Sequence, residues 1–187
     1  MLRLQTIKRT EPELLKNMAV HYSQPKGFVG TNICYAIWFE DKLYGHIVGG
    51  SSTRFLPGRN EFFGKSFSLN SIVNNIFYHV EKKDDKYPMR NFTAQVLRLF
   101  REVIALDWFV KYGDKVTGFE SLVEKPRSGD CYKKDGWELV GETVGYTCKR
   151  VAGKGTDSWS GKRVWDTKNL RPKLVFCKML NNKDSKK

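Results

Sequence analysis

The spacing of apolar residues predicts two long helices. Apolar side chains recur every three to four positions across residues 11–22, and again from a cap at Asn91 or Thr93 to about Asp107. This period is typical of amphipathic helices. Thr10 is expected to cap the first helix, because a hydroxyl at that position can accept a hydrogen bond from a free N–H group of the first turn.

Short runs rich in β-branched and aromatic residues predict the strands. Residues 34–40 and 43–50 form an expected hairpin, and residues 71–81 and 115–124 form strands on either side of the second helix. Two further strands are expected at 137–150 and 172–180. A helix between 71–81 and 115–124 allows that pair to lie parallel through a crossover. This mixed order predicts an α+β fold.

Three segments interrupt the pattern. Residues 49–66 are a long polar stretch, which we expect to be a loop. Residues 129–136 are expected to form a short helix or a turn. Residues 149–173 are a basic insertion in which Trp159 and Trp165 lie among the charges. Aromatic residues between basic ones can stack on bases, so this insertion indicates nucleic-acid binding.

The charge of the chain favours the same partner. Its 187 residues contain 33 Lys and Arg against 20 Asp and Glu, and residues 147–187 contain twelve Lys and Arg against three Asp. Clustered basic charge attracts phosphate backbones, although a solubilising surface with a basic tail is the alternative. The residues expected to contact DNA are Arg127, Lys133, Lys149, Arg150, Lys162, Arg163, Trp159 and Trp165.

Length and composition limit the other possibilities. A chain of this size fits one domain, which we place at residues 1–180 with a basic tail at 181–187. No apolar run approaches the roughly 18 residues of a membrane span, and we see no signal peptide, so we expect the cytoplasm of a bacterial host cell. The cysteines lack metal-ligand spacing, which predicts reduced thiols and no metal site.

Two pairs of polar residues lie within predicted apolar strands. Glu120 is a candidate base with a raised pKa if it is buried, and an ion pair with Lys or Arg is the alternative. Ser121 is a site residue or a plain polar contact, and strand alternation places it on the other side from Glu120. Asn74 and Asn75 can bond a ligand or the backbone, or mark a bulge.

Several motifs carry a resemblance to known proteins. The most specific is the run GDCYKKDGWELVGET at residues 129–143; the others are His21-Tyr22, Leu43-Tyr44-Gly45, Arg90-Asn91, Asp107-Trp108 and Tyr112-Gly113. Together they resemble the GNAT-like acyltransferase fold. They are more closely similar to the phage Mom DNA-modification proteins and to the DruA-type proteins of bacterial anti-phage systems. The resemblance covers roughly residues 18–180.

The resemblance implies a sheet with a splayed pair of parallel strands that holds the reactive group. It implies acyl-CoA or a related acyl donor, whose pyrophosphate meets a helix start at Arg90, Asn91 and Thr93. The chain departs from ordinary acetyltransferases because it lacks their Gln/Arg-x-x-Gly-x-Gly/Ala loop. The resemblance also makes Tyr132 a general acid, with a packing Tyr as the alternative, and places His21 beside the acceptor.

These expectations combine into a leading hypothesis and two alternatives. The leading hypothesis is a Mom-like, anti-restriction transferase that modifies the exocyclic amine of an adenine extruded from DNA. It requires Glu120 and Tyr132 to converge at one opening, with Glu120 or His21 aiding deprotonation. The alternatives are a non-catalytic, DruA-like DNA-binding component and a GNAT acetyltransferase acting on protein or small amines. DNA is the expected partner, membranes are not, and a homodimer is one possible assembly.

Overall fold

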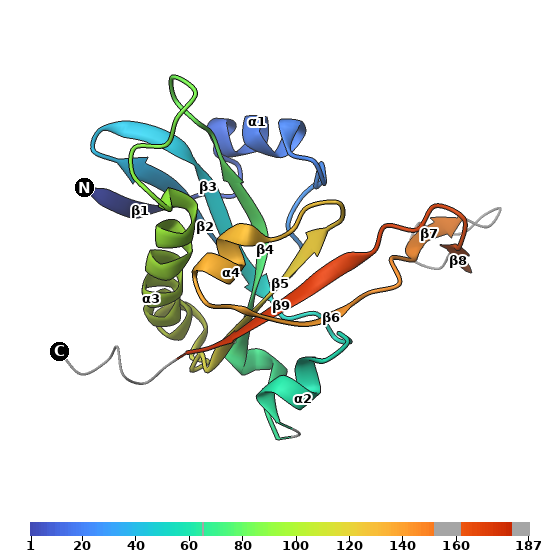
Figure 1. The fold of residues 1–187 in the computed structure, drawn as a ribbon. Coiled ribbons are helices and arrows are strands. Elements are labelled where there is room, and N and C mark those ends of the chain that lie inside the picture. The colour runs from blue at the N-terminus through green and yellow to red at the C-terminus, as the bar shows by residue number, and fades with distance from the viewer. Residues whose placement is uncertain (65, 152–161, 181–187) are drawn as a thin grey trace.

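One seven-stranded sheet organises the chain. The computed structural model describes residues 1–64, 66–151 and 162–180, and in this part the sheet order is β1-β2-β3-β4-β5-β9-β6 (Figure 1). Its strands are β1 (Leu2–Ile7), β2 (Asn32–Phe39), β3 (Lys42–Ser51), β4 (Ile72–Val80), β5 (Gly118–Glu124), β6 (Glu138–Glu142) and β9 (Lys173–Met179). The flanking helices are α1 (Pro12–Val20), α2 (Arg59–Phe63), α3 (Phe92–Tyr112) and α4 (Asp130–Lys134).

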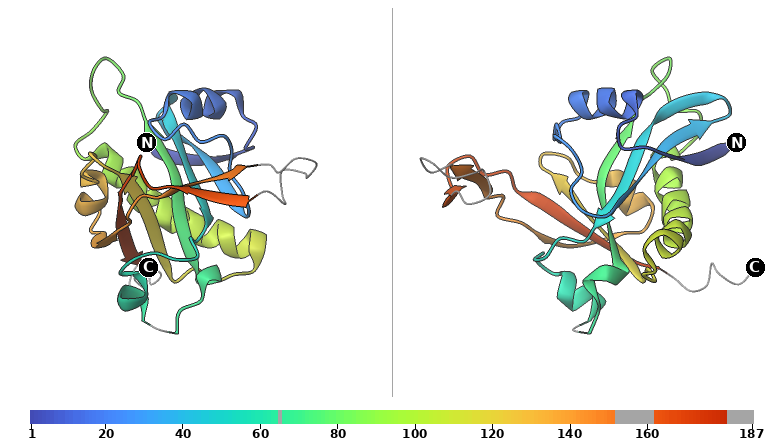
Figure 2. Two further views of the ribbon diagram at one scale, coloured as in Figure 1. Left: turned by 90° about the vertical axis from the view of Figure 1, so that its right-hand side faces the viewer. Right: turned by 180° about the vertical axis from the view of Figure 1, so that it is seen from behind.

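The helices cover the two faces of the sheet in pairs. The apolar stripe of α3, including Phe100 and Ile104, packs on one face together with Tyr132 of α4. On the other face, Leu14 and Met18 of α1 pack against one half of the sheet, and α2 lies over the half that contains β9. Figure 2 shows α1 and α3 on opposite sides of the sheet. Each face therefore has its own core.

The pair β4 and β5 differs from the other neighbours in this sheet. These strands run parallel, whereas the other described pairs of the sheet are antiparallel. A parallel pair needs a crossover connection, and α3 supplies it. Pairing joins Ile72–Asn75 to Gly118–Ser121 and then stops, although β4 continues to Val80 and β5 to Glu124. The C-terminal halves of the two strands therefore separate.

A bulge in β4 begins at the same level. Val48 pairs with Phe77 and Gly49 pairs with Asn75, which leaves Ile76 without an opposite residue. The Asn75 side chain donates hydrogen bonds from Nδ2 to the carbonyl oxygens of Val48 and Phe77, each at 3.1 Å. A bulge bends the strand that carries it. The bend turns β4 where its pairing with β5 ends.

The α+β class, the hairpin and the parallel crossover pair predicted from the sequence are confirmed. The sequence did not predict β1, and it assigned α2 to a loop. The expected strand 137–150 is two strands, because β6 ends at Glu142 and a separate hairpin, β7 (Thr147–Val151) with β8 (Lys162–Asp166), follows it. The first helix has Glu11 at its N-cap in place of Thr10.

No helix among the described residues is both long enough and apolar enough to cross a membrane.

Candidate active site between two separating strands

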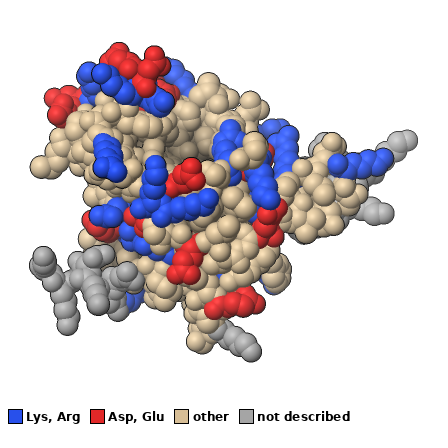
Figure 3. All heavy atoms as spheres, viewed as in Figure 1, with Lys and Arg blue, Asp and Glu red and all other residues tan. Residues whose placement is uncertain are grey.

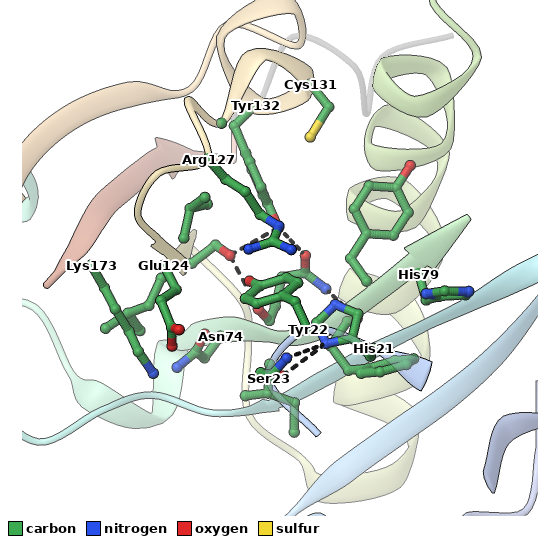
Figure 4. Close-up of a pocket in the computed structure, with 18 of the residues that line it drawn as sticks. His21, Tyr22, Ser23, Asn74, His79, Glu124, Arg127, Cys131, Tyr132 and Lys173 are labelled. Atoms are coloured by element: carbon green, nitrogen blue, oxygen red, sulfur yellow. Dashed lines mark hydrogen bonds between the residues drawn. The ribbon is translucent and has the colours of Figure 1, made fainter. Parts of the chain in front are cut away.

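A cavity of about 720 Å³ opens where β4 and β5 separate. Its walls come from the C-terminal halves of both strands, the start of α4, and the connection after α1 (Figure 4). Asn75, Ser121 and Tyr132 line it on the face of the sheet that carries α3 and α4. Asn74 and Glu124 line it on the opposite face. The cavity therefore passes through the sheet at the split.

A buried hydrogen-bond network lies on the α4 side of this cavity. The Tyr132 hydroxyl donates to Asn75 Oδ1 at 2.6 Å, and Ser121 Oγ lies 2.9 Å from the Tyr132 oxygen and 3.1 Å from the Asn75 carbonyl oxygen. Both N–H groups of the Asn75 amide are held by backbone carbonyls, so its oxygen must face Tyr132. Burial raises the pKa of Tyr132 well above its ordinary value. The phenol therefore carries its proton at neutral pH.

Packing fixes the Tyr132 ring in this position. The ring stacks on Phe176, with centroids 5.4 Å apart, and meets Trp137 edge-on at 5.1 Å. Gly129 begins α4 with φ +69°, and a Cβ there would meet the Phe176 ring at 2.4 Å. Because only glycine allows this approach, Gly129 sets how closely α4 and its tyrosine pack onto the sheet.

His21 also lines the cavity, but both of its ring nitrogens are occupied. Nδ1 accepts from the backbone N–H and the hydroxyl of Ser23, and the ring bonds the Tyr78 backbone through its other nitrogen. Burial, assisted by the neighbouring His79, lowers the pKa of His21 to about 4. His21 is therefore neutral at pH 7, and this geometry favours a positioning role for it, which ties the end of α1 to β4.

Glu120 lies on the other face of β5 from Ser121 and Tyr132 and is fully buried. Its carboxylate accepts hydrogen bonds from the Arg59 guanidinium at 3.0 Å and from the Thr53 backbone N–H. It is absent from the described lining of the cavity. The expected convergence of Glu120 with Tyr132 is thus wrong, because the alternation that turns Ser121 toward Tyr132 turns Glu120 toward α2. The ion pair, left open by the sequence, is what the structure contains.

Arg127 lies at the mouth of the cavity, with its guanidinium carbon 3.6 Å from the centroid of the Tyr22 ring. This contact joins the β5–α4 loop to the connection after α1 (Figure 4). Lys133 is half exposed, and its Nζ lies 3.6 Å from Asp130 Oδ1. On the face seen in Figure 3, Lys and Arg side chains alternate with Asp and Glu. That face has mixed charge, so it is not an unbroken basic surface.

The predicted donor contacts do not line the cavity, and most of the predicted DNA contacts lie outside what the structure describes. Arg90, Asn91 and Thr93 occupy the start of α3, and the Thr93 carbonyl accepts from the Tyr78 hydroxyl at 2.7 Å. None of the three is among the described residues that line the cavity. Four predicted DNA contacts belong to the β7–β8 hairpin, namely Lys149, Arg150, Lys162 and Arg163, together with Trp165. The side chains of these five, and Trp159 entirely, lie outside what the structure describes, so their roles stay predictions.

Of the residues that line the cavity, Glu124 and Lys173 were not predicted from the sequence, Tyr22 was named only with His21 in the motif that carries the resemblance, and Asn74 and Asn75 were left as ligand or backbone contacts. Asn75 proves to bond the backbone at a bulge and to orient Tyr132 as well. Two adjacent amides in an apolar strand were the available signal. The contribution of Lys173 depends on the pairing of β9 with β5, which places it directly opposite Glu124.

Comparison with known proteins supports the fold. No family model and no curated protein matches the chain. A solved structure of a Bacillus subtilis acetyltransferase in complex with CoA matches with a TM-score of 0.58 and 14% identity, covering 97% of this chain and 100% of that one. A GNAT family acetyltransferase from Elizabethkingia anophelis with acetyl-CoA bound matches with a TM-score of 0.56 and 9% identity, covering 96% and 98%.

An aminoglycoside 6'-N-acetyltransferase from Enterococcus faecium matches with a TM-score of 0.52 and 10% identity, covering 97% of this chain and 98% of that one. The chain has the GNAT acetyltransferase fold. At these identities the likeness establishes the arrangement of elements and no more. None of the three named structures is a Mom or a DruA-type protein, so that finer resemblance stays an expectation from the sequence.

Proposed function

We propose that this protein transfers an acyl group from acyl-CoA to an amine. One observation carries the proposal: a cavity passes through the sheet at the β4–β5 split, with the protonated Tyr132 hydroxyl on its wall. The GNAT fold adds support, since two of the matching acetyltransferase structures contain CoA or acetyl-CoA.

The strand edges at the split fit the pantetheine arm of such a donor. β4 beyond Asn75 pairs with β3, and β5 beyond Ser121 pairs with β9, but the two no longer pair with each other. Their facing edges therefore present backbone N–H and C=O groups to the cavity. An extended molecule with amide groups can bond such an edge as an added strand would.

The start of α3 is the proposed site for the donor's phosphates. A helix N-terminus has free N–H groups and a favourable dipole for anions, and α3 is 21 residues long. Arg90, Asn91 and Thr93 belong to this helix start, and the Tyr78–Thr93 hydrogen bond connects it to the cavity wall. Arg90, which is exposed, supplies a positive charge beside these N–H groups.

Tyr132 and Ser121 are the proposed catalytic pair. Bound acyl-CoA supplies an acyl group activated by its bond to sulfur. As the amine nitrogen bonds the acyl carbon and the carbon–sulfur bond breaks, Tyr132 gives its proton to the departing sulfur. The Ser121 hydroxyl, 2.9 Å from the phenol oxygen, can donate to the phenolate that results. The attacking nitrogen releases one proton to solvent as the amide forms, and solvent returns a proton to Tyr132.

Calorimetry with CoA and a thiol-release assay with acetyl-CoA and primary amines test this function. We expect CoA to bind and amines to accelerate thiol release. Arg90→Ala should weaken CoA binding several-fold, while Arg9→Ala, an exposed arginine in the β1–α1 connection, should leave it unchanged. Folded protein that fails to bind millimolar CoA would overturn the proposal.

Adenine in DNA is a second candidate acceptor, favoured by the net charge of +13 and by its concentration in the last 41 residues. In this version, DNA docks through the basic segment and a base leaves the duplex to reach the cavity. Mass spectrometry of nucleosides from DNA co-expressed with the protein is the test. An altered adenine supports this acceptor, and an unmodified profile from cells that contain folded, CoA-binding protein contradicts it.

A further inference from the structure

The side chain of Asn74 has an unmet hydrogen-bonding group at the cavity. Asn74 is only 4% exposed, and it lines the cavity on the face opposite Tyr132. Its Nδ2 donates to the Thr53 hydroxyl at 3.0 Å. Its Oδ1 is buried and has no hydrogen-bond partner in the described structure. A buried acceptor without a partner is unfavourable, so its presence needs an explanation.

The neighbouring hydrogen bonds determine which way this amide points. The Thr53 hydroxyl donates to the Glu120 carboxylate, so its oxygen can only accept from Asn74. The donating Nδ2 must therefore face Thr53, and Oδ1 must be the atom without a partner. Glu120 and Arg59 hold Thr53 in place through its backbone as well. The buried ion pair thus fixes the orientation of Asn74.

A carboxylate lies on the same side of the cavity. Glu124 alternates with Glu120 along β5, so both point to the face that carries α1 and α2. The Glu124 side chain is 17% exposed, and the Arg171 guanidinium lies 3.9 Å from it. Figure 4 shows Asn74, Glu124 and Lys173 on one side of the cavity and Tyr132 on the other. Asn74 and Glu124, which each carry a side-chain hydrogen-bond acceptor, therefore line the cavity across from the proposed acid.

We propose that Asn74 Oδ1 and the Glu124 carboxylate bind the acceptor amine, an inference that rests on the proposed acyltransferase function. An N–H group of the amine satisfies Oδ1, and the charge of Glu124 attracts the ammonium form and takes its surplus proton. The nitrogen then forms its bond to the acyl carbon as the bond to sulfur breaks, the proton from Tyr132 goes to sulfur, and the second proton that the nitrogen loses passes to solvent. Acid and base act from opposite faces of the sheet.

This arrangement selects the class of amine. A primary aliphatic amine is protonated in neutral solution, so a carboxylate favours its binding and removes its proton before attack. The exocyclic amine of a nucleobase carries no such charge and gains nothing comparable from Glu124. The acceptor is therefore a primary aliphatic amine, and a nucleobase is the outcome that would argue against this site.

Thiol-release kinetics with acetyl-CoA and ethanolamine, glycine, putrescine, tyramine or a single-stranded oligonucleotide test the assignment. Asn74→Leu should raise the KM for the best amine at least tenfold and leave the KM for acetyl-CoA within twofold. Asn74→Asp keeps an acceptor oxygen but loses the donor to Thr53, so it should raise the KM for the amine less than Asn74→Leu does. Asn70→Leu changes an exposed asparagine outside the cavity and is the matched control.

The pH dependence of kcat/KM in Glu124→Gln is a second test, because the loss of a purely structural residue would not change it. We expect its kcat/KM for the amine to fall about tenfold at pH 7 and to recover most of the loss at pH 9, where more amine is already deprotonated. Glu142→Gln, at a half-exposed carboxylate on β6, should show no such recovery.

The outcomes separate the two proposals. Wild-type protein that binds CoA and acylates an amine, with an amine KM unaffected by Asn74→Leu, overturns the amine site and leaves the function standing. The site is also overturned if CoA binds but only the oligonucleotide, or no compound in the panel, accelerates thiol release. Failure to bind CoA at all defeats the proposed function itself.

Discussion

Glu120 and Ser121 are neighbours in β5, yet they belong to two different polar regions. On one face, Glu120 and Arg59 form a buried ion pair whose carboxylate is bonded on several sides and has no access to the cavity. On the other face, Ser121, Tyr132 and Asn75 form a buried network that borders the cavity. Burial and polarity are common to both regions. Access to a cavity is what separates a candidate catalytic group from a structural one.

The largest expected effect concerns the network that borders the cavity. Tyr132→Phe should lower kcat for thiol release by about 10²–10⁴-fold, because a general acid contributes roughly that much. The phenyl ring keeps its stacking on Phe176, so the fold should survive. Tyr112→Phe removes a hydroxyl that bonds Asn32, away from the cavity, and should retain wild-type kcat. Equal kcat values for Tyr132→Phe and Tyr112→Phe would show that Tyr132 is not the general acid.

Breaking the Glu120–Arg59 ion pair should lower stability and leave kcat nearly unchanged. Glu120→Gln leaves the Arg59 charge buried without a counter-charge, which should lower the free energy of unfolding by about 3 kcal/mol. The kcat of the protein that remains folded should stay within about threefold of wild type, since Glu120 does not reach the cavity. Urea unfolding and thiol release on the same sample measure both quantities. A stable but inactive Glu120→Gln would assign Glu120 a chemical role after all.

Asn75 both holds the backbone at the bulge and orients Tyr132. Replacing it should therefore lower stability less than Glu120→Gln does and lower kcat less than Tyr132→Phe does. Asn75→Ala removes two hydrogen bonds to backbone carbonyls and the acceptor for Tyr132, which should cost about 2 kcal/mol of stability. Without that acceptor the phenol loses its fixed orientation, and kcat should fall about tenfold with little change in KM. Asn70→Ala is the exposed control. An effect on stability alone would make Asn75 purely structural.

The histidines of the α1 face extend the comparison to pH. Burial lowers the pKa values of His21 and His46 to about 4 from an ordinary 6.5. Below pH 6.5 the unfolded chain binds protons that the folded chain does not, so stability should fall as the pH drops from about 6.5 toward 4. The expected slope is about 1 kcal/mol per pH unit for each histidine. His46→Gln should roughly halve this slope in urea unfolding at pH 6.5 and 5.5, and an unchanged slope would contradict this assignment.

The sequence predicted the elements that depend on local pattern. The amphipathic stripe of α3 and the apolar runs of β2 to β5 are strong periodic signals, and the α3 crossover explains the parallel pair. β1 was missed because an edge strand buries little of its surface, and α2 because five residues are too few to show a helical period.

The sequence could predict the orientation of site residues only within a single strand. Alternation along β5 correctly separated Ser121 from Glu120, but nothing in the sequence shows that Arg59, 61 positions earlier, neutralises Glu120. The hydrogen-bond network of Tyr132, Asn75 and Ser121 depends on the bulge in β4 and on the packing of α4. Those are tertiary features, and the two adjacent asparagines were their only trace in the sequence.

A crystal structure of the protein with bound CoA would show where the donor lies. We expect the pantetheine arm between β4 and β5, with the sulfur within hydrogen-bonding reach of the Tyr132 hydroxyl and the phosphates near the start of α3. A CoA molecule bound elsewhere, with Tyr132 still donating to Asn75 and the split between the strands filled by side chains, would contradict this expectation.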